Sequence, residues 1–192
     1  MKKKILIITV IIVIISIVAI ITYTDDELHF KISYEYINYI EYNNGKKIKV
    51  SIPANNKIKY VSNTELLDIL NKQTGIVYFG YNTCPWCRNA VPILIDAVKK
   101  NNIETIYYAD IHKLKLSSIK EELYSKLSQY LHEDNEGEKV LAVPGVYFLV
   151  DGEIVCNHTG TVESYHNPYN KMTKEQQEEL LDIYDKCIKE MK

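Results

Sequence analysis

The feature that most constrains this chain is a pair of cysteines, in the sequence Cys84-Pro85-Trp86-Cys87, at the junction of two strongly patterned segments. The apolar run 76–79 before the pair is typical of a buried strand. After the pair, apolar residues recur on one face of a predicted helix: Val91, Leu94, Ile95 and Val98. Pro85 would occupy the first helical position, where its missing N–H costs nothing. The pattern therefore predicts a buried strand that leads into a helix whose first turn carries both thiols.

A thiol at this place is suited to thiol–disulfide exchange. Cys84 would lie among unpaired backbone N–H groups at the positive end of the helix dipole, and both favour the reactive thiolate. Cys87, one turn further on, would be placed to attack a mixed disulfide formed on Cys84. The spacing thus predicts a nucleophile followed by a resolving cysteine.

A metal site is the competing interpretation of a C-x-x-C pair. Its further ligands would have to come from Cys156, His158, His166 and Cys187. The chain has no second C-x-x-C, and the spacing matches no common zinc module. We therefore predict redox chemistry with no metal and no cofactor.

Patterns on either side of the pair predict alternating strands and helices. Strands are expected at 58–61, 76–79 and 103–109, and helices over 62–72, from residue 84, and over 116–131. Residues 133–139 are expected to form a charged loop. A hairpin is predicted around Asp151-Gly152 and a final helix after Thr173. This order predicts an α/β fold with a mixed central sheet and helices on both faces.

The N-terminus predicts a membrane anchor over residues 1–23. Lys2, Lys3 and Lys4 precede the apolar run 5–21, whose helix would rise about 25 Å toward the ~30 Å of a hydrocarbon core. The lysines should stay in the cytoplasm, which would leave a single-pass protein in the cell membrane with its C-terminal domain extracytoplasmic. A cleaved signal peptide is the alternative, but no Ala-x-Ala-type site follows the run.

Residues 24–57 are expected to form a juxtamembrane spacer or a hairpin, and residues 58–192 the main domain. Asn43-Asn44-Gly45 followed by alternating apolar residues favours the hairpin, whereas the spacing of Phe30, Ile37 and Ile40 favours a helix. Residues 25–192 carry 20 Lys and Arg against 25 Asp and Glu, which argues against a nucleic-acid partner.

Taken together, the motifs resemble thioredoxin over about residues 58–191. Cys84-Pro85-Trp86-Cys87-Arg88 is followed by Pro92, five residues after the second cysteine, as in thioredoxin's active-site helix. Val143-Pro144 resembles the family's cis-proline loop, and Gly160 follows at the family's spacing of 16 residues from Pro144. The nearest likeness is to small membrane-bound thioredoxin-like proteins of Gram-positive bacteria, including bacteriocin-transport accessory types.

The resemblance implies a role for each matched position. Cys84 would be the nucleophile, Cys87 the resolving cysteine and Pro144 the cis-proline, while the backbone of Val143 would pair with an extended substrate and Gly160 would border the same groove. Further expectations concern support for the motif: Trp86 offers apolar contact area or packs beside the cysteines, and Arg88 adds positive potential or only solvates the helix. Partners would be protein or peptide thiols and disulfides, with a membrane electron donor or acceptor.

Three departures from thioredoxin bear on this interpretation. Tyr78 stands where thioredoxin has a buried aspartate, and Thr83 stands where it has a tryptophan. The chain is also longer than thioredoxin between Cys87 and Pro144. A non-catalytic accessory module of a secretion or bacteriocin-transport system therefore remains an alternative. Cys156 and Cys187 are either separate or joined as a structural disulfide.

Overall fold

The computed structural model describes residues 7–16 and 25–192. The predicted anchor over 1–23 lies partly outside these residues. Residues 7–16 are helical, and no helix among the described residues is both long and apolar enough to cross a membrane.

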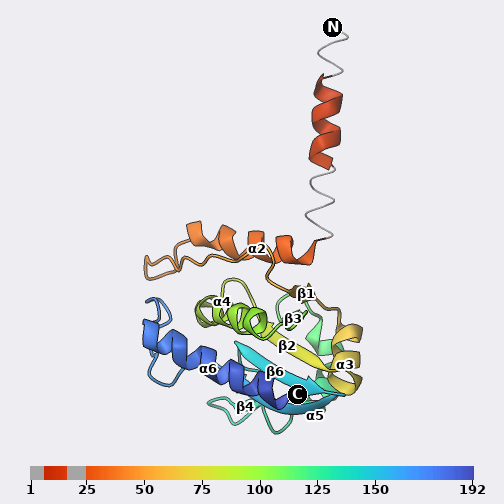
Figure 1. Ribbon diagram of the computed structural model, residues 1–192, viewed down its shortest axis with the longest axis vertical. Coiled ribbons are helices and arrows are strands. Elements are labelled where there is room, and N and C mark those ends of the chain that lie inside the picture. The colour runs from red at the N-terminus through yellow and green to blue at the C-terminus, as the bar shows by residue number, and fades with distance from the viewer. Residues whose placement is uncertain (1–6, 17–24) are drawn as a thin grey trace.

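A five-stranded mixed sheet forms the centre of the molecule (Figure 1). Its strands, in spatial order, are β1 (Ile58–Tyr60), β3 (Ile106–Asp110), β2 (Gly75–Gly80), β6 (Gly145–Val150) and β7 (Glu153–Thr159). The first three are parallel, whereas β6 and β7 run antiparallel to their neighbours. The predicted mixed sheet is confirmed.

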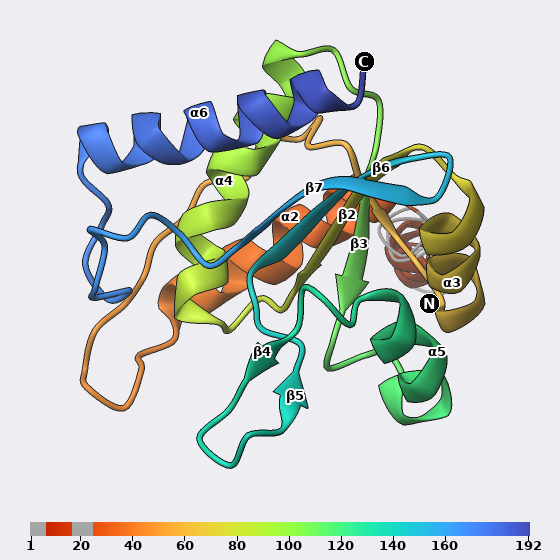
Figure 2. The same ribbon diagram turned by 90° about the horizontal axis from the view of Figure 1, so that it is seen from below.

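Helices cover both faces of this sheet, as Figure 2 shows. One face carries α2 (Asp26–Tyr36), α4 (Pro85–Lys100) and α6 (Lys174–Glu190). The other carries α3 (Asn63–Lys72) and α5 (Lys120–Lys126). Successive side chains of a strand point to opposite faces of the sheet. Tyr78 therefore lies in the core between the sheet and α2, α4 and α6, whereas Phe79 lies in the core between the sheet and α3 and α5.

Local signals placed several boundaries correctly. Ser62 and Glu65 form the predicted capping box of α3, and Thr173 and Gln176 form one at α6. Asp151 and Gly152 both have positive φ in the two-residue turn between β6 and β7.

The long helix predicted over 116–131 is wrong in length. The structure has a 3₁₀ turn, η2 (Leu116–Ser118), and then the short α5. Ser118 does not cap α5, whose N-cap residue is Ile119; the Ser118 oxygen accepts from the Asn63 side-chain amide, and its hydroxyl donates to the Lys115 carbonyl. The charged loop 133–139 also contains regular structure, since β4 (His132–Glu133) pairs with β5 (Lys139–Val140).

In place of the spacer or hairpin expected over 24–57, the described residues 25–57 form packed structure, and it begins with a helix, the alternative that the spacing of Phe30, Ile37 and Ile40 favoured. Residues 26–36 form α2, and a 3₁₀ turn, η1 (Ile37–Tyr39), follows it. Residues 40–57, which we call the strap, contain a turn but no strand. Phe30, Tyr34 and Ile52 are fully buried against the sheet and α4. Burial of these side chains explains why the segment docks on the domain and does not stand off from it.

Candidate active site

Cys84 and Cys87 lie where β2 gives way to α4. Cys84 is the N-cap residue of α4, and its Sγ accepts a hydrogen bond of 3.1 Å from the Cys87 backbone N–H. Both cysteines are free thiols. Cys84 keeps 2% of its surface exposed and Cys87 keeps none, so an incoming sulfur can reach only Cys84.

The two thiols differ in acidity. The pKa of Cys84 is lowered, chiefly by a hydrogen bond from the Cys87 thiol and further by backbone amides of the first helical turn, against the effect of burial. The pKa of Cys87 is raised well above its ordinary value, first by burial and then by its bond to Cys84. This polarisation gives a nucleophile at Cys84 and a protonated partner at Cys87.

The loop predicted to hold the cis-proline does so, because the Val143–Pro144 peptide bond is cis. Pro144 is buried, and Val143 packs against the core that contains both cysteines. Gly160 donates from its backbone N–H to the Pro144 carbonyl at 2.7 Å and has a φ of +84°, which a glycine adopts without strain. The structure thus brings these residues to the end of the sheet at which Cys84 and Cys87 lie, while their roles toward substrate stay predictions.

Aromatic side chains surround the cysteine pair. Trp86 is half-buried and packs edge-on against Tyr165, with ring centres 5.5 Å apart. From the strap, the Tyr42 hydroxyl donates to the Thr83 carbonyl at 2.9 Å, and its ring packs edge-on against Tyr169. Sequence reasoning missed the three tyrosines, because their positions relative to Cys84 depend on the docking of distant segments.

Arg88 is fully buried, which excludes the predicted role in solvating the helix. Its guanidinium donates to the backbone carbonyls of Tyr34, Ile48 and Asn82 and to the side-chain oxygen of Asn38, at 2.6–3.1 Å. Burial lowers the pKa of Arg88. The side chain therefore joins α2, the strap and the loop before Cys84.

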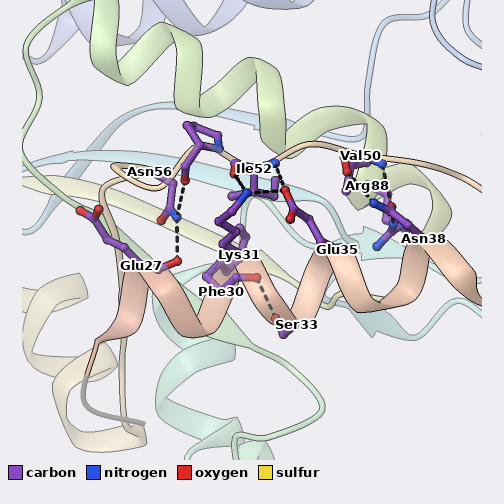
Figure 3. Close-up of polar contacts among 11 residues, drawn as sticks. Glu27, Phe30, Lys31, Ser33, Glu35, Asn38, Val50, Ile52, Asn56 and Arg88 are labelled. Atoms are coloured by element: carbon purple, nitrogen blue, oxygen red, sulfur yellow. Dashed lines mark hydrogen bonds and ion pairs between the residues drawn. The ribbon is translucent and has the colours of Figure 1, made fainter. Parts of the chain in front are cut away.

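Side chains of α2 and η1 hold the C-terminal part of the strap, as Figure 3 shows. Asn38 bonds both the N–H and the carbonyl of Val50. Glu35 accepts from the Ile52 N–H, and the Lys31 ammonium donates to the Ile52 carbonyl. These bonds satisfy backbone groups of a segment that has no strand partner.

Four further positions complete the comparison with the sequence. Pro92 lies inside α4, as the resemblance implies. Cys156 and Cys187 form a disulfide that joins β7 to α6. His158 is half-buried and bonds the Thr161 carbonyl. No group of three or more potential metal ligands occurs among residues 7–16 and 25–192.

Tyr78 is fully buried behind the cysteines, and its hydroxyl lies 3.2 Å from that of Tyr34. The ordinary pKa of a tyrosine hydroxyl is near 10, and burial raises the pKa of Tyr78 well above that value. It therefore cannot accept a proton at neutral pH as a carboxylate would.

No protein-family model and no curated protein matches the chain. Among solved structures, the chain is similar to thioredoxin O2 from Arabidopsis thaliana in the oxidized state, with 21% identity over 56% of this chain and 85% of that chain, and a TM-score of 0.40. Thioredoxin O1 from the same plant, also in the oxidized state, is 21% identical over 56% of this chain and 88% of that chain, with a TM-score of 0.41. Thioredoxin from Aeropyrum pernix is 22% identical over 53% of this chain and 74% of that chain, with a TM-score of 0.36. These similarities are weak, so the fold is assigned from this chain's own sheet and helices.

Proposed function

We propose that this protein is a thiol–disulfide oxidoreductase that acts on protein or peptide substrates through Cys84 and Cys87. The observation that carries the proposal is the polarised pair, in which a thiol of lowered pKa lies at a helix N-terminus with a small part of its surface accessible, and its partner is fully buried one turn away. Attack of the Cys84 thiolate on a client disulfide gives a mixed disulfide, which Cys87 then resolves. The reverse sequence oxidises a client dithiol.

Single substitutions of the two cysteines test this function. In the full-length protein, Cys84→Ser should abolish exchange with a peptide disulfide, and Cys87→Ser should accumulate the mixed disulfide on Cys84. The matched control is Cys156→Ala with Cys187→Ala, which removes the other disulfide and should retain exchange. Full exchange by both single variants would refute the proposal. A Cys84–Cys87 disulfide that mild reductant cannot open would favour a non-catalytic accessory module.

We also propose that the domain lies outside the cytoplasm, attached to the cell membrane by a single N-terminal anchor, and exchanges electrons with a membrane donor or acceptor. The lysines before the apolar run support this orientation, and the Cys156–Cys187 disulfide supports an oxidising compartment. A membrane-impermeant maleimide should label Cys84 in intact cells after mild reduction. Labelling only after the cells are lysed would contradict the proposed location.

A further inference from the structure

The side of α2 that points away from the sheet carries apolar and aromatic side chains. Among residues 26–40, the exposed side chains, which we call the outer face, are those of Ile32, Tyr36, Tyr39 and Ile40. Their spacing of three or four residues places them on one side of the segment formed by α2 and η1. Tyr36 keeps 66% of its surface exposed and Tyr39 keeps 81%. The solvent-facing side of a helix ordinarily carries polar residues, so an apolar one marks a binding surface.

The charged and amide side chains of this segment point toward the domain instead. Asp26 accepts a hydrogen bond from the Tyr60 backbone N–H, and Glu27 accepts one from the backbone N–H of Lys57. The side chains that bind the strap, as Figure 3 shows, are those of Lys31, Glu35 and Asn38. Because these groups are directed at the sheet and the strap, the outer face is left without a charge.

The outer face lies close in sequence to the proposed membrane anchor. Only residues 22–24 separate the apolar run 5–21 from Asp25, the N-cap residue of α2. Since an extended chain spans at most about 3.6 Å per residue, Ile21 and Asp25 are at most about 14 Å apart. The interfacial layer of a bilayer is roughly 5–7 Å deep on each side of the hydrocarbon core. An anchor that ends at Ile21 therefore holds the start of α2 inside this layer or just beyond it.

The side chains of the outer face are those that suit a lipid surface. Tyrosine is enriched at membrane–water interfaces, because its ring enters the apolar layer while its hydroxyl stays among the headgroups. Tyr36 and Tyr39 present such rings, and Ile32 and Ile40 add purely apolar area. An uncharged face also meets no repulsion from anionic lipids. A protein partner, in contrast, would have to enter the narrow space that the short connection leaves between the anchor and α2.

We propose that the outer face rests on the lipid surface beside the anchor and holds the domain in a fixed orientation on the membrane. This inference rests on the proposed membrane location and does not depend on the redox chemistry. The short connection keeps the face at a high effective concentration next to the bilayer, so weak contacts are sufficient for it to stay bound.

Contact at the outer face also fixes the position of the redox site relative to the bilayer. Ile40 lies two residues before Tyr42, whose hydroxyl donates to the Thr83 carbonyl at 2.9 Å. Arg88 adds a second connection between α2 and the loop before Cys84. The nucleophile is therefore held at a set distance from the membrane, which favours clients and redox partners that are themselves bound to it.

A fluorescent label on the outer face tests the contact in the full-length protein. Cys84→Ser with Cys87→Ser gives a background without a free thiol, because Cys156 and Cys187 are joined to each other. Tyr36→Cys then takes a nitrobenzoxadiazole label, and the protein is reconstituted in vesicles of phosphatidylcholine and phosphatidylglycerol. We expect the emission to shift to shorter wavelength and the fluorescence to fall when a lipid with a spin-labelled headgroup is included.

Two variants provide matched controls for this measurement. Ser125→Cys places the same label on α5, which covers the opposite face of the sheet (Figure 2), and should show neither the shift nor the loss of fluorescence. Ile32→Gln with Tyr39→Gln, added to Tyr36→Cys, should abolish the quenching. Both side chains are exposed, so the melting temperature of this variant should match that of its parent.

Extraction of the vesicles with alkaline carbonate tests the anchor separately. A protein that resists extraction but whose label is not quenched would refute the lipid contact alone. A wavelength shift without quenching would likewise overturn it, because a protein partner or a second copy would then cover the face. A protein that carbonate removes, but whose label is quenched when vesicles are added, would refute the anchor and support the contact. If carbonate removes a protein whose label is never quenched, both proposals are wrong.

Discussion

Replacement of Arg88 by methionine tests how strongly one side chain attaches the N-terminal segment to the redox site. The change removes the donor to the carbonyls of Tyr34, Ile48 and Asn82 and to the Asn38 side chain. Each buried acceptor left unpaired costs roughly 1–3 kcal/mol. The methionine offsets part of this loss, because it fills similar volume and avoids burying a charge. We therefore expect a net loss of about 3–5 kcal/mol, the range typical when one partner of a buried charged network is removed.

A loss of this size is a large part of the roughly 5–15 kcal/mol that stabilises a typical domain. Urea unfolding of the full-length protein, with the Cys84–Cys87 pair kept reduced, would measure it. The melting temperature should fall by about 10 °C at roughly 2–4 °C per kcal/mol. Amides of α2 should also exchange with solvent faster, because their segment loses its attachment to α4.

The matched control for this prediction is Lys99→Met, which removes an exposed cation of the same helix and its single exposed bond to Asn55 of the strap. Its effect should stay within about 0.5 kcal/mol. Arg88→Lys should fall between the two, since an ammonium lacks the planar fork that reaches several acceptors at once. A loss below about 1 kcal/mol in Arg88→Met would refute the view that this side chain holds the segment in place.

Three further outcomes follow from the structure. The rate at which iodoacetamide alkylates Cys84 should reach half its maximum at a pH below about 8.5, the ordinary pKa of a thiol, because the pKa of Cys84 is lowered. Cys87 should react far more slowly. Replacing Cys156 and Cys187 by alanine opens a cross-link that spans 31 residues and should cost about 3 kcal/mol in urea unfolding. Gly152→Ala should cost at least about 2 kcal/mol by the same assay, because φ is +82° and a Cβ would overlap the backbone of α3.

The parts of the fold that could be predicted from sequence are those set by local interactions. Ser62 and Glu65, which lie within one stretch of four residues, determine the start of α3. Asp151-Gly152 determines a turn by itself. Pro85 and Cys84 likewise identify the first turn of α4. Such signals need no knowledge of the tertiary structure, because donor and acceptor are neighbours in the chain.

The rest depends on distant residues that docking brings together. Arg88 follows the motif as an exposed cation would, yet its acceptors are up to 54 positions away in sequence. A helix in the region of α2 was only one of two alternatives from the sequence, because the buried face of α2 has only a few apolar residues, including Phe30 and Tyr34, among many polar ones. Polar side chains such as Asn38 form hydrogen bonds with the backbone of the strap. The periodicity of apolar residues cannot predict such bonds.

The two cysteines consequently acquire their acidity from different levels of structure. The pKa of Cys84 is lowered by the Cys87 thiol and by amides of its own helical turn, so every group that lowers it lies within the motif. Cys87 is enclosed by side chains from α2, β2 and α6, so its pKa depends on tertiary packing. Changes in the N-terminal segment should therefore affect the pKa of the buried thiol more than that of the nucleophile. Exchange rates that fall with no change in Cys84 alkylation would be the signature of such changes, because only the second step requires Cys87.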